Sequence, residues 1–512
     1  MEAMRKQTVI GVDIGTGGCK VVAFDLQGHL LAESFKEYSV HHPRLDWAEQ
    51  DPEDWWRAAC DALKEVTSKV GSENVLAVGL TSQREAFVPL DEKGEKLYNS
   101  IIWLDMRAIP QARKIEKLIS REKILRVTGV PIDHIFSAPK LLWIKENLPH
   151  VFERTRFILF AKDYIAFKLC DEKATDYSMA SRTMLFDIHK LKWSEEICET
   201  LGIPLDILPP PKGSWEVIGE VTSKASELTG LPKGAPVVAG GGDRPCEALG
   251  AGAIEEGEIN IGTGTGTVFE VPLSRPRPDS RGLIDCCCHV VPNTWEYEII
   301  INATGESLRW FRDNFGHEEI YRSKEEGVSP YELFNRAAAK IEAGAGGLFY
   351  YPYLWGARAP KFDPMARAVF IGFTHAHGKP AFIRAIMEGV AFQYVETIEL
   401  VERLGVSVRR ITMTGGEARS HIWNQIKADV LGRVIEVPEV LDAAALGACI
   451  LASVGVKAYK DFKEAIGGMV RIAKEYRPRP EAHAKYLKLY KAYQEVYEKL
   501  KECFRIIAEA IS

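Results

Sequence analysis

The stretch VVAGGGDRPCEALGA, Val237–Ala251, joins an apolar run to three glycines, an aspartate and a segment of small residues. The apolar run predicts a short buried strand, and the glycines allow a tight turn that leaves no side chain in the way of a ligand. Asp243 follows at the mouth of this turn, next to a candidate helix N-terminus. Its carboxylate can act as a general base on a substrate hydroxyl, or it can cap the helix, because aspartate is among the best N-cap residues.

The size and composition of the chain indicate an ordinary globular protein with more than one domain. Its 512 residues exceed what one hydrophobic core usually supports, so two domains of roughly 250 residues are expected. Hydrophobic residues make up 46% and charged residues 27%. The net charge is −6 with no basic tract, which argues against a nucleic-acid partner. No apolar run approaches the roughly 20 residues that span a bilayer, so no membrane association is expected.

The N-terminus and the cysteines predict a cytoplasmic protein. In MEAMRKQTVIGVDIG basic residues precede an apolar run, but Asp13 interrupts that run, and a signal peptide needs a longer apolar core and a cleavage site. The ten cysteines follow no CxxC spacing, which suits reduced thiols. The adjacent Cys286, Cys287 and Cys288 cannot all point at one metal and predict a buried strand.

Two strand–turn–strand patterns rich in glycine and threonine lie in different halves of the chain. They are Thr8–Val12 and Cys19–Phe24 around Asp13–Gly18, and Glu258–Ile261 and Thr267–Val271 around Gly262–Gly266. Backbone N–H groups and hydroxyls at such hairpin tips can form a nest for phosphate oxygens, although ordinary hairpin turns look the same. Two such tips suggest an internal duplication that clamps one nucleotide between two domains.

Charged and aromatic side chains follow two further apolar runs. Val75–Thr81 leads into Ser82-Gln83-Arg84-Glu85, and Ile101-Ile102 leads into Trp103-Leu104-Asp105-Met106-Arg107. Open α/β sheets place ligand contacts at the carboxyl ends of their strands. For Asp105 and Arg107, a salt bridge on a surface loop is the alternative.

Other segments carry recognisable local signals. Asp51 is a natural N-cap with Pro52 at the first helical position. Thr175–Arg182 is polar and small, which is more typical of a binding loop than of a core element. Gly415-Gly416, between a strand and a helix, leaves room for a planar base on the backbone or simply ends the strand. The final helix, Glu481–Ile511, carries an apolar stripe that packs on the chain's own body more often than on a partner.

In order and spacing, these motifs resemble the FGGY carbohydrate kinases of the actin/hexokinase superfamily over nearly the whole chain. The motifs are Asp13–Gly17, Ser82–Glu85, Trp103–Arg107, Gly242-Asp243, Ile261–Gly264, and Gly415-Gly416 with Trp423, Asp429 and Gly432. The resemblance implies an α/β fold of two ribonuclease-H-like domains, with a nucleotide and a sugar in the interdomain cleft. The expected parts are an N-terminal domain over 1–250, a C-terminal domain over 251–480 and a C-terminal amphipathic helix over 481–512.

The resemblance also implies roles for individual residues. Asp243 is the catalytic base, favoured over the helix cap in this context, and Asp13 helps to hold Mg²⁺. ATP is the expected phosphate donor, with its phosphates near Thr16, Gly17, Gly262, Thr263 and Gly264, and its nucleoside near Gly305, Arg309, Gly416 and Ser420. The expected acceptor site consists of Arg84, Glu85, Trp103, Asp243 and Arg244. Phosphoryl transfer needs positioning and charge neutralisation more than covalent chemistry, and these parts supply both.

The expected substrate is a small sugar or polyol, most simply a ketopentose such as xylulose. Ser82–Glu85 and Ala180–Phe186 are similar to glycerol kinase, whereas the segment Ala385–Phe392 is closer to xylulokinase. Ile135 stands where the glycerol kinases usually have a tyrosine, and Arg244 where they have a glutamine. Both changes favour an acceptor larger than glycerol. Autoinducer-2 kinases share Arg84-Glu85 and related motifs, and glycerol kinase stays the alternative.

Two other classes share this superfamily. Chaperone-type ATPases hydrolyse ATP and bind peptides, but no separate peptide-binding β-domain follows the second half of the sequence. Sugar-responsive binding proteins carry an N-terminal DNA-binding helical domain, whereas the first strand here begins near Thr8. A small-molecule partner is therefore expected, and a homodimer is a possible assembly.

Overall fold

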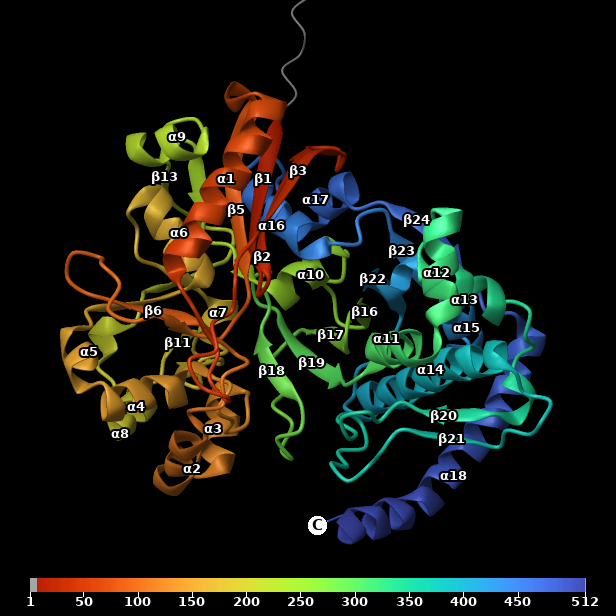
Figure 1. The fold of residues 1–512 in the computed structure, drawn as a ribbon. Helices are drawn as coiled ribbons and strands as arrows, with labels where there is room; N and C mark the ends of the chain where they lie inside the picture. The colour runs from red at the N-terminus through yellow and green to blue at the C-terminus, as the bar shows by residue number, and fades with distance from the viewer. Residues whose placement is uncertain (1–6, 512) are drawn as a thin grey trace, which may run out of the picture. The chain divides into compact units, whose positions relative to one another are not determined.

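The computed structural model describes residues 7–511, which fall into two compact units of mixed α/β structure (Figure 1). Unit 1 contains residues 7–255, 272–297 and 442–471, and unit 2 contains 256–271, 298–441 and 472–511. The domain boundaries expected at 250 and 480 divide the chain into continuous segments and stay a prediction. Residues 1–6, which include the basic residues weighed above as part of a signal peptide, and residue 512 lie outside the described residues.

The central sheet of unit 1 has the strand order β13-β14-β5-β1-β2-β3. Its strands are β1 (Thr8–Ile14), β2 (Gly18–Asp25), β3 (Leu30–Glu37), β5 (Val75–Ser82), β13 (Val217–Glu220) and β14 (Pro236–Val238), and β15 (Gly241–Gly242) also pairs with β5. The predicted first hairpin is confirmed, because β1 is antiparallel to β2. β1 and β15 both run parallel to β5, so all three strands end at the same edge of the sheet.

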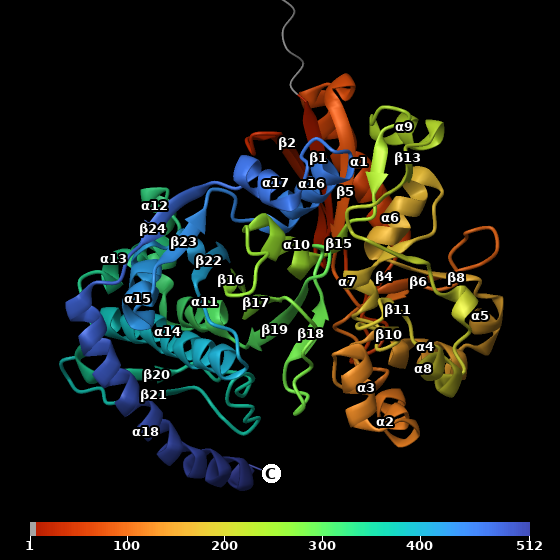
Figure 2. The same ribbon diagram turned by 180° about the vertical axis from the view of Figure 1, so that it is seen from behind.

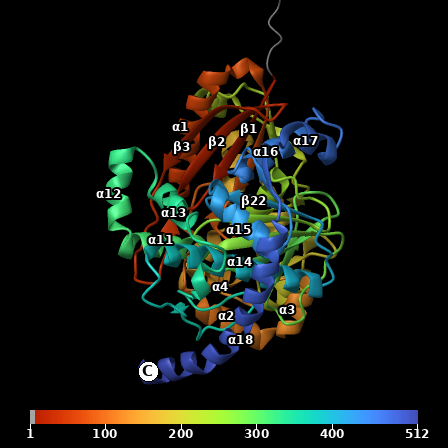
Figure 3. The same cartoon turned by 90° about the vertical axis from the view of Figure 1, so that its right-hand side faces the viewer.

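Helices cover both faces of this sheet. α1 (Pro52–Val70) packs on β2 and β3, and it begins as predicted, since Asp51 is its N-cap and Pro52 its first residue. α16 (Ala443–Gly455) packs on β1 and β5, on the other side of the strands in Figure 3. This approach needs glycine in the sheet, because a Cβ at Gly79 would collide with the carbonyl oxygen of Ala448.

The other elements of unit 1 are short. The helices are α2 (Ile109–Leu118), α3 (Arg121–Thr128), α4 (Ser137–Asn147), α5 (Pro149–Arg154), α6 (Ala161–Cys170), α7 (Tyr177–Ala180), α8 (Glu195–Leu201), α9 (Ser223–Thr229), α10 (Asp243–Gly250) and α17 (Phe462–Met469). The strands are β4 (Glu49–Gln50), β6 (Phe87–Leu90), β7 (Ser100–Ile101), β8 (Phe157–Phe160), β9 (Thr175–Asp176), β10 (Phe186–Asp187), β11 (Lys192–Trp193), β12 (Pro211–Lys212) and β18 (Asp285–Cys288). The strand predicted from the three adjacent cysteines is confirmed as β18, where all three are buried.

The segment Thr175–Arg182 is not the binding loop that its polarity predicted, but part of the buried interior of unit 1. It forms β9 and α7, and Asp176, Ser178 and Arg182 are all buried. The polar side chains are tolerated there because they hydrogen-bond to one another and to buried charges. Its composition therefore indicates an internal polar network.

The sheet of unit 2 repeats the topology of unit 1. It contains, in order, β19 (Trp295–Ile301), β17 (Thr267–Leu273), β16 (Glu258–Thr263), β22 (Arg410–Gly415), β23 (Ile435–Pro438) and β24 (Ile472–Tyr476). β16 is antiparallel to β17 and parallel to β22, as β1 is to β2 and β5. The second predicted hairpin is thereby confirmed, and its tip lies at Gly264–Gly266.

The helices of unit 2 include the long C-terminal helix expected from the sequence. They are α11 (Thr304–Phe315), α12 (His317–Glu326), α13 (Pro330–Ala338), α14 (Lys379–Arg403), α15 (His421–Leu431) and α18 (Pro480–Ile511), with strands β20 (Phe349–Tyr351) and β21 (Val369–Ile371) beside them. α18 packs on its own unit, beside α15 (Figure 2). In this packing Tyr493 stacks on Tyr351 at a centroid distance of 4.2 Å. The apolar spacing of this helix also predicted that Leu487 packs inward, but Leu487 is 48% exposed.

No helix among the described residues combines the length and the apolar character needed to cross a bilayer.

Candidate active site

The strand register of unit 1 brings several predicted residues to one edge of the sheet. Ile14 of β1 and Gly242 of β15 both lie opposite Ser82, the last residue of β5. Asp13, Arg84 and Asp243 stand within two residues of these positions. The arrangement follows from parallel pairing, because the carboxyl ends of parallel strands share an edge.

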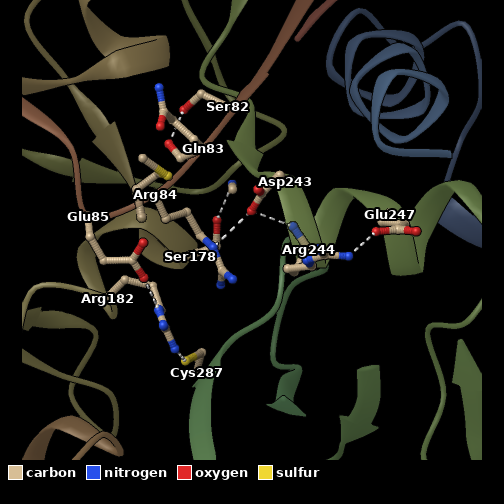
Figure 4. A network of polar contacts seen from close by, with 12 residues as sticks. Ser82, Gln83, Arg84, Glu85, Ser178, Arg182, Asp243, Arg244, Glu247 and Cys287 are labelled. Carbon is tan, nitrogen blue, oxygen red and sulfur yellow. Dashed lines mark hydrogen bonds and ion pairs between the residues drawn. The ribbon is translucent and has the colours of Figure 1, made fainter. Parts of the chain in front are cut away.

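Asp243 is held at the start of α10 by two donors. Its Oδ1 lies 3.0 Å from the Nε of Arg84 and accepts a hydrogen bond of 2.9 Å from the Arg244 N–H (Figure 4). Gly242 occupies the N-cap position, so the alternative of Asp243 as the N-cap is wrong. The Asp243 side chain is 37% exposed, whereas that of Arg84 is 7% exposed. The carboxylate is therefore oriented by a buried partner and still open to a solute.

Glu85 is fixed through both its backbone and its side chain. Its backbone is left-handed, with φ at 62°, a strained conformation of the kind that clusters at functional sites. Its Oε1 accepts a 2.6 Å hydrogen bond from the Nε of Arg182, and its carbonyl oxygen accepts one of 3.2 Å from the Nζ of Lys140. Burial lowers the pKa of Lys140 to about 8. Arg182 also lies 2.6 Å from Asp285, so charges of both signs surround Glu85.

Of the predicted acceptor residues, Arg244 is bonded to another side chain of its own helix, whereas Trp103 is exposed beside the first hairpin tip. The Arg244 guanidinium is directed along α10 to Glu247, with Nη1 2.7 Å from Oε2 (Figure 4). Trp103 is 43% exposed, and its Nε1 donates a 3.0 Å hydrogen bond to the hydroxyl of Thr16. The predicted acceptor residue Trp103 is thus next to the first hairpin tip, where Gly17 is exposed and a Cβ would meet nothing within 4 Å.

Asp13 has the surroundings of a cation ligand. Its Oδ1 is buried and has no hydrogen-bond partner among residues 7–511. Burial, followed by the charge of Asp243, raises the pKa of Asp13 to about 7. Nowhere in this part of the chain do three or more His, Cys, Asp or Glu side chains gather as a metal site. The Asp13 carboxylate therefore suits a cation that completes its coordination with water and phosphate oxygens, as Mg²⁺ usually does.

The pair Asp105 and Arg107 is a buried ion pair, not a surface one. Their side chains are at most 1% exposed, with Nη2 and Oδ2 2.7 Å apart. Arg107 also lies 2.8 Å from Glu49 and covers the ring of Trp47. The pair can be buried because Glu49 helps to neutralise the guanidinium and Trp47 covers it, although both residues are distant in sequence. The pair fixes the loop that presents Trp103.

Unit 2 contains a cavity of about 470 Å³ that collects most of the predicted nucleotide residues. Its lining includes Gly264, Gly305, Arg309, Gly416 and Ser420. A Cβ at Gly416 would meet nothing within 4 Å, so the backbone there is open to a ligand. Arg309 forms an ion pair with Glu306 on the same helix.

The second hairpin tip packs against the N-terminus of α11. The Glu306 N–H donates a 3.0 Å hydrogen bond to the carbonyl oxygen of Thr265, and a side chain at Gly305 would collide with the carbonyl oxygen of Gly264. Helix N-termini favour anions, because their first N–H groups lack partners within the helix. Gly262 and Thr263 lie within β16 and do not line the cavity. The Thr263 hydroxyl donates a 2.5 Å hydrogen bond to the carbonyl oxygen of Thr414.

Sequence reasoning missed the far wall of this cavity. Tyr331 and Asn335 of α13 line it, and Asn335 accepts a 2.7 Å hydrogen bond from the hydroxyl of Ser420. α13 is an ordinary amphipathic helix, and no local motif marks Tyr331 or Asn335 as ligand contacts. Trp423, to which the sequence assigned no role, also lines the cavity.

The fold and the site define a class of enzyme. Two copies of one α/β topology carry glycine-rich hairpin tips, an oriented carboxylate and a nucleotide-sized cavity, which are the parts of a phosphoryl-transfer enzyme. Residues 8–250 match the N-terminal domain of the FGGY family of carbohydrate kinases, and residues 259–456 match its C-terminal domain. The chain therefore belongs to the FGGY family of carbohydrate kinases, transferases that use ATP as the phosphate donor for a sugar.

Individual relatives match the chain over nearly their whole lengths, in agreement with this assignment. The chain is 32% identical to the xylulose kinase of Bacillus subtilis (strain 168) over 497 residues, covering 96% of this chain and 97% of the relative. It is 32% identical to a glycerol kinase of Saccharolobus islandicus over 510 residues, covering 98% of each. The crystal structure of xylulose kinase from Rhodospirillum rubrum matches with a TM-score of 0.87 at 27% identity, covering 97% of this chain and 100% of that one. The predicted family and the two-domain α/β fold are confirmed.

Proposed function

We propose that this kinase transfers the γ-phosphoryl group of ATP to a hydroxyl of a ketopentose such as xylulose, with Asp243 as the general base. The observation that carries the proposal is the Asp243 carboxylate, oriented by the buried Arg84 at 3.0 Å and still 37% exposed. A general base must keep a fixed direction and remain accessible to the proton that it removes. Asp243 satisfies both requirements.

In this mechanism the acceptor hydroxyl loses its proton to the Asp243 carboxylate as its oxygen attacks the γ-phosphorus, and the bond from the γ-phosphorus to the departing ADP breaks. Arg84 orients the base and stabilises the negative charge that gathers in the transition state. Glu85 accepts hydrogen bonds from other hydroxyls of the acceptor. Trp103 covers an apolar C–H face of the sugar with its exposed ring.

The phosphate donor has its own set of residues. Backbone N–H groups at Gly17 and Gly264, and the hydroxyl of Thr16, bind phosphate oxygens, and the cavity lined by Gly305, Gly416 and other residues of unit 2 binds the nucleoside. Asp13 would hold Mg²⁺, which offsets phosphate charge when bound. In this proposal residues 1–250 form the acceptor half, 251–480 the nucleotide half and 481–512 a C-terminal helix.

The preference for a pentulose over glycerol is inferred from Ile135, expected near the acceptor, and from the relatives. Ile135 brings no hydroxyl of the kind that a tyrosine would offer a small substrate, and its backbone N–H already donates a 3.1 Å hydrogen bond to Asp133. The relatives named xylulose kinase match this chain over nearly its whole length and share its fold. The relative named glycerol kinase keeps that substrate as the alternative.

A steady-state comparison of acceptors tests the proposal. ADP release is measured with D-xylulose, glycerol, a sugar acid and no acceptor under identical conditions. The kcat/KM for xylulose should exceed that for glycerol by about tenfold or more, because one lost hydrogen bond to a buried polar group costs about 1–3 kcal/mol. A higher value for glycerol would assign the alternative substrate. ADP release independent of any acceptor would instead indicate a chaperone-type ATPase.

A further inference from the structure

A fully buried group of charged side chains lies next to the turn that presents Asp243. The Nζ of Lys162, on α6, is 2.6 Å from Oδ1 of Asp163 and 3.1 Å from Oδ1 of Asp176. The same Nζ donates a 2.9 Å hydrogen bond to the carbonyl oxygen of Ala239. All three charged side chains are at most 1% exposed. Burial acts to lower the pKa of Lys162, but the two carboxylates hold it above its usual value, so the ammonium stays charged.

A second set of bonds continues from Asp176 to the far end of the turn. Asp176 Oδ2 accepts hydrogen bonds from the hydroxyls of Ser178 at 2.5 Å and Ser214 at 2.8 Å. The Ser178 hydroxyl in turn accepts a 2.9 Å hydrogen bond from the N–H of Gly242, the residue before Asp243 (Figure 4). One network therefore bonds to the turn at Ala239 and again at Gly242.

Apart from the buried methyl of Ala239, the turn has no side chains through which packing could hold it, and Gly241 and Gly242 are held by their pairing with β5. Gly240 has φ at 73°, and its N–H donates a 2.9 Å hydrogen bond to the carbonyl oxygen of Ser214. A Cβ at Gly241 would collide with Val290, so glycine is required there as well. The direction in which the turn delivers Asp243 therefore depends on hydrogen bonds to its backbone.

Stability alone does not account for such a network. Burying three charges is expensive, and well-packed apolar residues of similar volume are often as stabilising or more so. Hydrogen bonds inside a buried network are, however, strong, and they hold the groups that they join in one arrangement. Here the groups it touches are the two ends of the Ala239–Gly242 turn.

We propose that Lys162, Asp176 and Ser178 are positioning residues that hold the Ala239–Gly242 turn and thereby keep the Asp243 carboxylate in its productive orientation against Arg84. The inference rests on the proposed role of Asp243 as the base. It assigns a function to Asp176 and Ser178, which are not among the acceptor or nucleotide residues described above.

Ser178→Ala is the mildest test, because it removes the acceptor of the Gly242 N–H and leaves every charge in place. The kcat should fall about 10- to 100-fold, since a displacement of about 1 Å in a catalytic group can cost 100-fold. The KM for ATP should stay within about twofold, because no nucleotide residue is touched. A loss of stability without misplacement of Asp243 would lower the melting temperature and leave the kcat of the folded fraction unchanged, which would overturn the proposal.

Ser181→Ala is a matched control in the same segment. Ser181 is equally buried, and its hydroxyl likewise accepts a backbone N–H, that of Cys288 at 3.1 Å, and donates to a carbonyl, that of Ser178 at 2.9 Å. None of these bonds reaches the turn. Its kcat should therefore remain near that of the wild type, and an equal loss in both serine variants would overturn the proposal.

The Asp243→Asn background separates the inference from the proposed function. If Ser178 acts through Asp243, Ser178→Ala should cause no further loss of the residual turnover of Asp243→Asn. An additional 10- to 100-fold loss in that background would overturn the positioning role. Near-normal turnover of Asp243→Asn itself would instead overturn the proposed function. Should Ser178→Ala fail to fold, Asp176→Asn gives the same readouts, because it weakens the bonds to both Lys162 and Ser178.

Discussion

The two aspartates of the candidate site have contrasting surroundings. Asp243 is partly exposed and has an arginine partner, whereas the Oδ1 of Asp13 is buried and has no hydrogen-bond partner within residues 7–511. Burial, and then the negative charge of Asp243, makes ionisation of Asp13 unfavourable and raises its pKa to about 7. A group kept in such a state is a candidate for function, because stability alone would select a neutral side chain.

Asp13→Asn should therefore remove activity but increase stability at high pH. The pKa of Asp13 is about 7 in the folded state against 3.8 without the protein environment, so the folded state binds more protons between these values. Wild-type stability thus falls as the pH rises through this window, and asparagine does not ionise. Without Mg²⁺, the variant should be more stable at pH 8 by about 1–4 kcal/mol, given about 1.4 kcal/mol per pKa unit.

Urea unfolding at pH 4 and pH 8 measures this effect. The stability difference between Asp13→Asn and the wild type should shrink toward pH 4, where both folded proteins carry a neutral side chain. A difference of the same size at both pH values would show that the ionisation of Asp13 is not its cause.

The glycines in and between the sheet strands are of two kinds, those that leave space for a ligand and those that allow close packing. At the hairpin tips, a Cβ placed on Gly17 would meet no protein atom within 4 Å, and one on Gly264 would meet only the carbonyl oxygen of Gly266 at 3.7 Å. At Gly79, within β5, a Cβ would overlap the backbone of α16. The first kind leaves room for a ligand, and the second allows two elements to touch.

Gly17→Val and Gly264→Val should each weaken ATP binding about tenfold or more without unfolding the protein. The protein itself accommodates the side chain, so any clash is with phosphate oxygens approaching the backbone. Isothermal titration calorimetry with ATP measures the loss. Gly467→Val, which also has open space around its Cβ position, is the matched control and should bind ATP normally. Unchanged affinity in both tip variants would contradict the phosphate assignment.

Gly79→Ala should destabilise unit 1, whereas Gly467→Ala should not. The new methyl of Gly79→Ala meets the carbonyl of Ala448, and forced overpacking of this kind typically costs about 1–3 kcal/mol. Gly467 lies inside α17 with open space, where alanine is favoured over glycine by about 0.5–1 kcal/mol. Thermal melting compares the two, and a rise in melting temperature for Gly79→Ala would contradict the close packing of α16.

Local patterns predicted the elements well but not how buried charges are neutralised. The hairpins, the start of α1 and the meeting of Asp13, Arg84 and Asp243 at one edge follow from strand patterns and parallel pairing. The burial of Asp176 could not be predicted, because its partner Lys162 is remote in sequence and neither residue has an apolar pattern. The alternative of a surface salt bridge between Asp105 and Arg107 is wrong for a similar reason, because their partners Glu49 and Trp47 are also remote in sequence.

The whole chain contains one sheet topology twice, and each copy carries a different part of the proposed chemistry. Unit 1 presents the base, the acceptor residues and the candidate cation ligand. Unit 2 contains the cavity lined by most of the predicted nucleotide residues. A duplicated fold therefore accounts for both glycine-rich hairpins. In the proposal the two tips share phosphate binding and differ in their neighbours, with acceptor residues near the first tip and nucleoside residues near the second.

The most direct test of this account is the turnover of Asp243→Asn with a saturating acceptor and saturating ATP. Asparagine keeps the shape of the side chain but cannot take a proton at neutral pH, and general bases contribute about 100- to 10,000-fold. The account predicts a loss of kcat in that range, with the melting temperature and ATP affinity close to those of the wild type. A folded Asp243→Asn enzyme with near-normal kcat would contradict it.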